Sequence, residues 1–398
     1  MRLKSAVLAA ALVVSLVGAA AAPAATQQAE GEGYSGTFVE FQTNSNAVAD
    51  YAVDGSVIVE NVTAQSASET DGGIGVGASS STSIDGSGVS SQNSAGAKAS
   101  VAFESGTEME ANDNQRGVVT FTATDGEQVV QANVSGQAES EGDSRVVVTS
   151  DDGAQGTFFI VGDGEVTTSE DGRVMASVQE DSQLVYRQYN EERSDEDETQ
   201  ERMIQNGTAT AEAYVYGSAE SGGEAESEGT SVVEYGQDTS VEVQERSESQ
   251  INMTVERTES QGKVIITTVS ESAVENAESL EVYVDGEAAA QANSYGEVQQ
   301  ATQDGEESRY LVRQSSSAQA ATDVVVGINE FSERQVSMQS ADDGGEMTET
   351  EDGSMDDEMT ETEDGSTDDG SDGDGAGFGV IAALVALAAT LVAVRSRL

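Results

Sequence analysis

The sequence predicts an all-β protein of antiparallel strands. Many short runs alternate apolar and polar residues with the period of two that half-buried strands have. Nine Asp-Gly pairs separate such runs between residues 26 and 340, and this dipeptide favours tight hairpin turns because both positions tolerate positive φ. The clearest case is the pair Asp125-Gly126 between GVVTFTAT and EQVVQANV, where we predict a hairpin. Comparable runs start at residues 37, 144, 156, 262, 280 and 322.

The first 25 residues have the layout of a secretory signal peptide. Arg2 and Lys4 precede an apolar run, and small residues follow up to Ala25, which is the order of charged, apolar and cleavage regions in such peptides. We therefore expect a signal helix over residues 1–25 that is cleaved on export. A retained signal anchor is the alternative.

A repeated order of short motifs divides the body into two β units, at residues 34–190 and 203–332. Four motifs of the first unit return in the same order about 120 residues later, which indicates an internal duplication. The paired positions are Asn133 and Asn252, Arg145 and Lys263, Asp163 and Asp285, and Arg187 and Arg313. The two units either stand in tandem or pack as one pseudo-symmetric sandwich.

Two segments interrupt this pattern of strands. Residues 191–202 have the sequence EERSDEDETQER, which is polar and dense in charge. This composition predicts a linker or a short exposed helix between the units. Residues 72–100 are rich in Gly and Ser and poor in apolar residues. They predict either a flexible insertion or thin strands at the edge of a solenoid.

Residues 341–375 predict an acidic disordered stalk. They contain 16 acidic residues and no basic one, and EMTETEDGS occurs twice, at 346–354 and 358–366. Blocks of like charge without apolar periodicity stay extended. No window has the spacing of an EF-hand loop, so we predict diffuse cation association and no defined metal site.

A transmembrane or sorting helix is predicted at residues 376–394. These 19 residues carry no charge, and a helix of that length covers about 28 Å, close to the hydrocarbon thickness of a bilayer. Arg395 and Arg397 follow as the membrane-stop signal, with the body outside and the last residues inside.

The start of this helix resembles a known sorting signal. Gly377 and Phe378 open an Ala/Leu/Val helix after an Asp/Gly/Ser/Thr spacer and before terminal arginines. The arrangement is similar to the PGF-type tail of exported haloarchaeal surface proteins, although Ala376 stands where that family has proline. The resemblance implies that an archaeosortase removes the helix and leaves the protein on a membrane lipid. Retention as a transmembrane helix is the alternative.

The charge balance indicates a high-salt habitat. The chain has 17 Lys and Arg against 74 Asp and Glu, a formal net charge of -57. Such a surface repels nucleic acid, so no nucleic-acid partner is expected. The repulsion between carboxylates is strongly screened only when the Debye length shrinks, to about 3 Å near 1 M salt. An acidic protein from an ordinary compartment is the alternative.

Four sequons lie in the exported part, at Asn61, Asn133, Asn206 and Asn252. They are glycosylation candidates, and a glycosylated asparagine must face solvent.

The residue inventory argues against an enzyme. The chain has no His and no Cys, which removes the commonest general base, the thiol nucleophile and most transition-metal sites. We predict no catalytic residue, no cofactor and no metal ligand. Paired carboxylates could serve a hydrolase, and this is the least favoured alternative.

The sequence therefore predicts a secreted, membrane-anchored acidic surface protein of structural or interaction type, on the extracellular face of the cell membrane. Its expected partners are the membrane, through the C-terminal helix or an attached lipid, a sorting enzyme and other surface-layer proteins. The main alternative is a surface module that binds a solute, a polymer or a divalent cation in a groove between strands.

Overall fold

A computed structural model of the chain describes residues 33–70, 86, 88–92, 97–151, 153–189, 192–217, 229–236, 238–247, 249–274, 276–314 and 321–340. The predicted signal peptide, the acidic stalk and the sorting helix, with Ala376, Gly377, Phe378, Arg395 and Arg397, all lie outside these residues. Within them, neither helix is long and apolar enough to cross a membrane.

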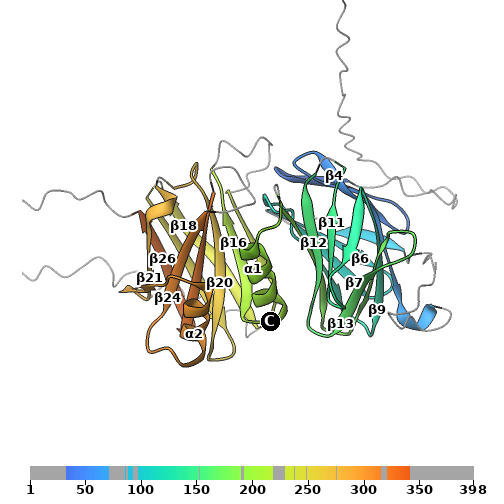
Figure 1. Cartoon of the computed structure of the whole chain (residues 1–398). Helices are drawn as coiled ribbons and strands as arrows, with labels where there is room; N and C mark the ends of the chain where they lie inside the picture. Colours follow the sequence, from blue (N-terminus) through green and yellow to red (C-terminus); the bar gives the residue numbers. More distant parts are fainter. Residues whose placement is uncertain are drawn as a thin grey trace, which may run out of the picture. The chain divides into compact units, whose positions relative to one another are not determined.

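The described chain forms two β-sandwiches, each made of two sheets (Figure 1). In the first sandwich, the seven-stranded sheet contains, in spatial order, β1 (Gly33–Ser35), β2 (Val39–Thr43), β3 (Val48–Val53), β4 (Ser56–Ser66), β9 (Gln128–Val134), β14 (Val174–Val178) and β13 (Gly164–Thr168). The eight-stranded sheet contains β10 (Gln137–Ser140), β11 (Arg145–Thr149), β12 (Gln155–Val161), β15 (Gln183–Tyr189), β8 (Val119–Ala123), β7 (Thr107–Asn112), β6 (Lys98–Phe103) and β5 (Val89–Gln92).

The second sandwich has a six-stranded and a five-stranded sheet. The six-stranded sheet contains β17 (Thr230–Glu234), β16 (Ala209–Val215), β20 (Gln261–Ser270), β25 (Ala321–Glu330), β24 (Arg309–Gln314) and β23 (Ala290–Gln291). The five-stranded sheet contains β18 (Thr239–Ser247), β19 (Gln250–Arg257), β26 (Glu333–Ser340), β21 (Leu280–Val284) and β22 (Glu287–Ala288). Two short 3₁₀ turns, η1 (Ala67–Glu69) and η2 (Ala277–Ser279), complete the strand-rich part.

The prediction of antiparallel β structure is confirmed, with two exceptions. The strand pairs β16–β20 and β23–β24 run parallel, and both lie in the second sandwich. Because alternation along a strand is the same whichever way its neighbour runs, the sequence pattern carries no information on strand direction. The second β unit also extends beyond its predicted end at residue 332, because β26 continues to Ser340.

The hairpin predicted at Asp125-Gly126 is wrong. Strand β8 pairs with β7 and β15 in one sheet, whereas β9 pairs with β4 and β14 in the other. The turn therefore carries the chain from one layer of the sandwich to the other. Phe121 and Val130 are both buried in the same core, and inward-facing positions alternate in the same way whether two strands pair or face each other across a core. True two-residue hairpins occur at Asp54-Gly55 and Asp285-Gly286, where all four residues have positive φ.

Each sandwich has its own hydrophobic core between its two sheets. The first core is built around residues such as Phe41, Val62, Phe121 and Phe158, and the second around Ile251, Ile265 and Val326. The two β units therefore do not combine into one sandwich. The paired motifs also fall on strands with different neighbours, since Arg145 lies on an antiparallel strand of the first sandwich and Lys263 on β20, which is parallel to β16. The duplication itself stays a prediction.

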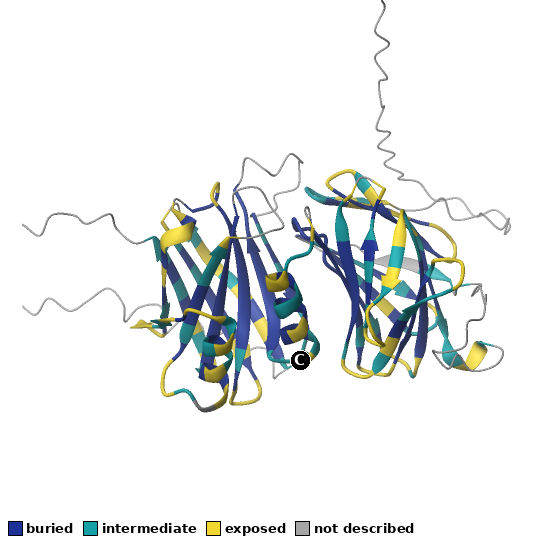
Figure 2. Ribbon diagram, viewed as in Figure 1, coloured by how far each residue is buried: buried dark blue, intermediate teal, exposed yellow. Residues whose placement is uncertain are grey.

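A third apolar cluster joins the two sandwiches through a helix. Helix α1 (Asp195–Gln205) contributes Met203 and Ile204, which cluster with Phe159 and Val185 of the eight-stranded sheet and with Ile266 and other residues of the six-stranded sheet. Several strands are consequently buried on both faces, and Figure 2 shows them in dark blue. In β16, all seven residues are buried.

Helix α1 occupies most of the segment predicted as a linker or short exposed helix. Ser194 caps its first turn, because the Ser194 hydroxyl accepts from the Asp197 N–H at 3.2 Å and the Asp197 carboxylate accepts from the Ser194 N–H at 2.9 Å. Four acidic residues in that turn also suit the positive end of the helix dipole. One side of the helix is nevertheless buried, so the expectation of an exposed helix is wrong. A second helix, α2 (Tyr295–Asp304), covers β20, β24 and β25.

The Gly/Ser-rich segment 72–100 is described only in part. Its described residues include β5 and the start of β6, which pair antiparallel at the edge of the eight-stranded sheet.

Candidate functional site

The four sequon asparagines are all at least partly exposed. Asn61 on β4 and Asn133 on β9 are directly opposed partners in the seven-stranded sheet. Asn252 lies on β19, and Asn206 is the exposed C-cap residue of α1. Their exposure is compatible with glycosylation, which stays a prediction. The structure brings together only the first two.

A buried ionic cluster lies where α1 and the two sandwiches meet, and we call it the junction. We define it as Arg116, Arg187, Asp197, Gln200, Glu201, Glu212 and Asp323, all of which are buried. Its residues come from one loop, two sheets and one helix. Such a set of desolvated charges is stable only when each ion is paired and hydrogen-bonded.

Arg116 is the centre of the junction. It lies in the loop between β7 and β8, its side chain is 0% exposed, and it reaches Asp323 on β25 at 2.8 Å and Asp197 on α1 at 3.2 Å. Its own carbonyl accepts from the Gln188 N–H at 2.9 Å, which fixes the loop against β15. One guanidinium therefore connects the first sandwich, the helix and the second sandwich.

The carboxylate of Asp323 is held from three sides. Besides Arg116, it accepts from the Thr268 hydroxyl at 2.8 Å and from the Gln200 amide at 3.0 Å. The same Gln200 amide donates to the Tyr295 hydroxyl at 3.2 Å. These contacts satisfy both oxygens of a carboxylate that has no access to water.

Arg187 makes a second bridge between the sandwiches. Its guanidinium lies 3.0 Å from the Glu212 carboxylate on β16 and donates to the Gln200 side chain at 2.6 Å. The Tyr214 hydroxyl donates to the other oxygen of Glu212. Arg116 and Arg187 also lie over the ring of Tyr189, at 5.6 and 5.7 Å from its centroid, a distance at which the ring quadrupole attracts a cation.

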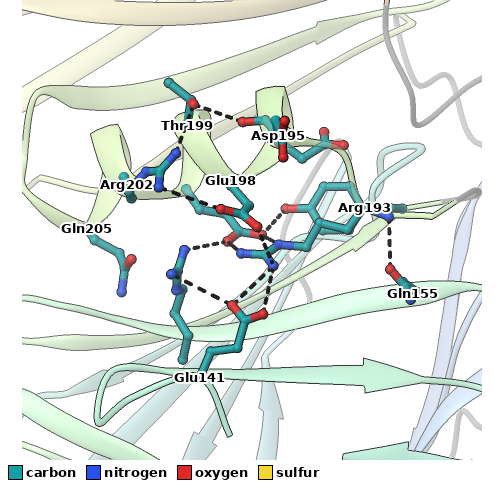
Figure 3. A network of polar contacts seen from close by, with 12 residues as sticks. Glu141, Gln155, Arg193, Asp195, Glu198, Thr199, Arg202 and Gln205 are labelled. Carbon is teal, nitrogen blue, oxygen red and sulfur yellow. Dashed lines mark hydrogen bonds and ion pairs between the residues drawn. The ribbon is translucent and has the colours of Figure 1, made fainter. Parts of the chain in front are cut away.

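Glu201 attaches the helix to the first sandwich. Its two oxygens accept from Arg193 at 2.8 and 2.6 Å, a bidentate pairing, and the Tyr189 hydroxyl donates to it at 2.5 Å. Figure 3 shows how the pairing continues outward, because Arg193 also contacts Glu141 at 3.2 Å and Glu198 at 3.5 Å. The charged residues are thus buried at the centre of this network and exposed to solvent at its edge.

Pairing decides the protonation of these groups. Burial and the neighbouring Arg187 act to lower the pKa of Arg116, but Asp323 and Asp197 outweigh them, so the pKa lies above its ordinary value. Burial acts to raise the pKa of Asp197, whereas Arg116, Arg187 and hydrogen bonds from Ser194 lower it to about 2. Burial raises the pKa of Tyr295 to about 12. At neutral pH Arg116, Arg187 and Asp197 are therefore charged, and Tyr189, Tyr214 and Tyr295 around them are neutral.

We expect Asp197 to make the protein acid-sensitive below pH 4. Its pKa is about 2 in the folded protein and near 4 when unfolded, so its stabilising effect is complete above pH 4 and is lost as the pH falls toward 2. The difference corresponds to about 2 kcal/mol. Unfolding free energies measured from pH 5 to pH 2 should fall less steeply for Asp197→Asn than for the wild type. Parallel curves for the two proteins would contradict this.

A polar groove lies on the outer face of the five-stranded sheet. Its volume is about 550 Å³, and its lining comes from strands β18, β19, β21 and β26 and the turn after β21. Of the twelve lining residues only Glu245 is charged, in a chain with 23% charged residues. The lining residues are Gln244, Glu245, Gln250, Asn252, Met253, Thr254, Tyr283, Gly286, Gln335, Val336, Ser337 and Gln339.

Hydrogen bonds between the side chains fix the floor of this groove. The Gln250 amide donates to the Asn252 side-chain oxygen and to the Ser337 hydroxyl, both at 3.0 Å. Asn252 in turn donates to Glu245 at 3.4 Å. The sequon Asn252-Met253-Thr254 therefore lines the groove itself.

The described residues include no group of three or more acidic side chains that could hold a metal ion.

The sequence predicts a groove between strands only as an alternative and does not locate it, and it does not predict the junction. In the sequence, Arg187 stands out only as part of a repeat motif. Arg116 gives one signal, because it is an arginine directly before the apolar run GVVTF in a chain with few basic residues. The groove has a signal as well. QINMT and RQVSMQS place uncharged amides and hydroxyls at alternate positions of two strands, although the chain is otherwise strongly acidic.

No family model matches this chain, and no curated protein matches it. One similar solved structure is a mutant of the glycoside hydrolase family 81 protein from Clostridium thermocellum, with 11% identity and a TM-score of 0.36. The match covers 76% of this chain and 34% of that protein.

Proposed function

We propose that this protein is a structural or interaction component of a cell surface, exported and held at the outer face of the membrane by its C-terminal tail. The observation that carries the structural role is the junction, because buried ion pairs and an apolar cluster make the two sandwiches one body. The net charge of -57 supports a location in brine. The tail sequence supports attachment at the membrane.

Fractionation of cells that express the full chain tests the location. We expect the wild-type protein in the membrane fraction, cleaved near Ala25, and a variant that ends at residue 375 in the medium. Mass spectrometry of the native C-terminus distinguishes the two attachments, since residues 379–398 are absent after sorting and present in a retained helix. Recovery of the untrimmed chain from the cytosol would refute the proposal.

A second candidate function, binding of a solute or polymer, is favoured by the groove on the five-stranded sheet. The groove has the volume of a small-molecule site, in the range of about 300 to 1,000 Å³. In so acidic a chain, acidic side chains are expected on an outward sheet face, and the groove is lined by only one.

A further inference from the structure

We infer that the groove on the outer face of the five-stranded sheet binds a neutral, multiply hydroxylated chain, that is, an oligosaccharide without charged groups. This inference rests on the second candidate function and specifies its ligand class. It depends on the charge, the hydrogen-bonding groups and the geometry of the groove.

The charge of the lining excludes ionic ligands. The groove has no basic side chain to attract an anion, and a protein of net charge -57 repels one at long range. A divalent cation needs several oxygen ligands, including carboxylates. The groove offers one carboxylate, Glu245, and this already accepts from Asn252.

The hydrogen-bonding groups favour hydroxyls. Ser337 accepts from Gln250 at 3.0 Å and from Gln339 at 3.3 Å, so its own O–H hydrogen remains available to donate. Asn252 has a second amide hydrogen besides the one that faces Glu245. The floor thus offers donors and acceptors side by side, and the single oxygen of a hydroxyl can both donate and accept.

Tyr283 supplies an apolar surface at one side of the groove. Its hydroxyl donates to Glu281 at 2.9 Å, and the half-buried ring lies on β21 opposite Ser337 on β26. An aromatic ring beside fixed polar groups combines apolar contact with oriented hydrogen bonds. Met253 and Val336 of the lining are buried and point into the core, so the accessible part of the floor is mainly polar and does not suit an apolar peptide.

The inference also fits the high-salt setting. Salt at molar concentration screens exposed charges over about 3 Å, which weakens recognition of ionic ligands. Hydrogen bonds between amides and hydroxyls do not depend on long-range fields. A neutral site is therefore effective under the conditions in which the acidic surface is stable.

The location of Asn252 adds a specific consequence. A glycan attached to Asn252 would itself occupy the groove, so the binding form has an unmodified Asn252. Comparison of the protein made with and without N-glycosylation therefore separates modification from recognition.

Calorimetric titration of the purified full chain in multimolar salt tests the inference. The neutral probes are cellohexaose, maltohexaose and mannohexaose, and the anionic probe is hexagalacturonic acid. We expect at least one neutral probe to bind and the anionic probe to give no signal. Tyr283→Ala and Gln335→Ala should each weaken binding on the order of tenfold, the effect of losing a contact worth about 1.4 kcal/mol.

The matched control is Gln42→Ala, which removes an exposed glutamine from the outer face of the seven-stranded sheet and should leave binding unchanged. Protein made without N-glycosylation should bind, and protein glycosylated at Asn252 should not. If no neutral probe binds, or if Gln335→Ala and Gln42→Ala behave alike, the inference is wrong. Binding of hexagalacturonic acid alone would refute the ligand class and leave a binding function standing, and the surface location is decided separately by fractionation.

Discussion

Replacement of Arg116 by methionine should lower the free energy of unfolding by about 3 to 5 kcal/mol, the usual cost of removing one partner from a buried ion pair. The cause is that Asp197 and Asp323 would remain buried without their cation, at contacts that are now 3.2 and 2.8 Å. Thermal or denaturant unfolding followed by circular dichroism measures the loss. It is among the largest effects that we expect from any single substitution in this chain.

The control for Arg116 is Arg173→Ala. Arg173 pairs with Asp171 at 2.8 Å, but Asp171 is 51% exposed, and exposed pairs contribute only about 0 to 1 kcal/mol. A further variant distinguishes the loss of packing from the effect of leaving buried carboxylates without a cation. Asp323→Asn in the Arg116→Met background should recover part of the stability, because it removes one of the uncompensated carboxylates. Equal stabilities of Arg116→Met and Arg173→Ala would show that the junction does not hold the sandwiches together.

Dilution from multimolar salt to about 0.1 M should abolish most of the β signal in circular dichroism. The Debye length grows from about 3 Å at 1 M to about 10 Å at 0.1 M. In a chain with net charge -57, each carboxylate then repels several neighbouring carboxylates. This repulsion destabilises the compact state.

Sucrose provides the control for the dilution experiment. It favours burial without screening charge, so it should restore less β signal than sodium chloride of equal osmolarity. The loss caused by Arg116→Met should be nearly the same at all salt concentrations where the protein folds, since buried pairs are little screened. An undiminished β signal at 0.1 M salt would refute the high-salt interpretation.

The strands were predictable because their signal is local. The alternation in TFVEFQT and the apolar runs RVVVT and KVIITT correspond to β2, β11 and β20. The pairing of strands was not predictable to the same degree. Asp54-Gly55 and Asp125-Gly126 look alike in sequence, yet the first closes a hairpin and the second crosses between sheets. The partner of a strand depends on packing across the core, which a dipeptide does not encode.

The junction was unpredictable for a related reason. Arg116 meets Asp197 and Asp323, which lie 81 and 207 residues further along the chain. In a chain with 74 acidic residues, the sequence does not distinguish these two carboxylates from the rest. The burial of helix α1 was unpredictable for the same reason. Its charge-dense sequence indicates exposure, whereas its burial results from contacts with residues that are distant in sequence.

Because the junction is buried, two properties of this acidic protein can change independently. These are the cohesion of the two sandwiches and the tolerance to ionic strength. Over evolutionary time, outward-facing carboxylates can be gained or shed as the habitat becomes saltier or fresher, and each such replacement tunes only the tolerance to ionic strength. The contacts of Arg116 and Arg187 lie beyond the reach of solvent ions. We therefore expect descendants in different waters to diverge in their surface acids while they retain the same internal arginines.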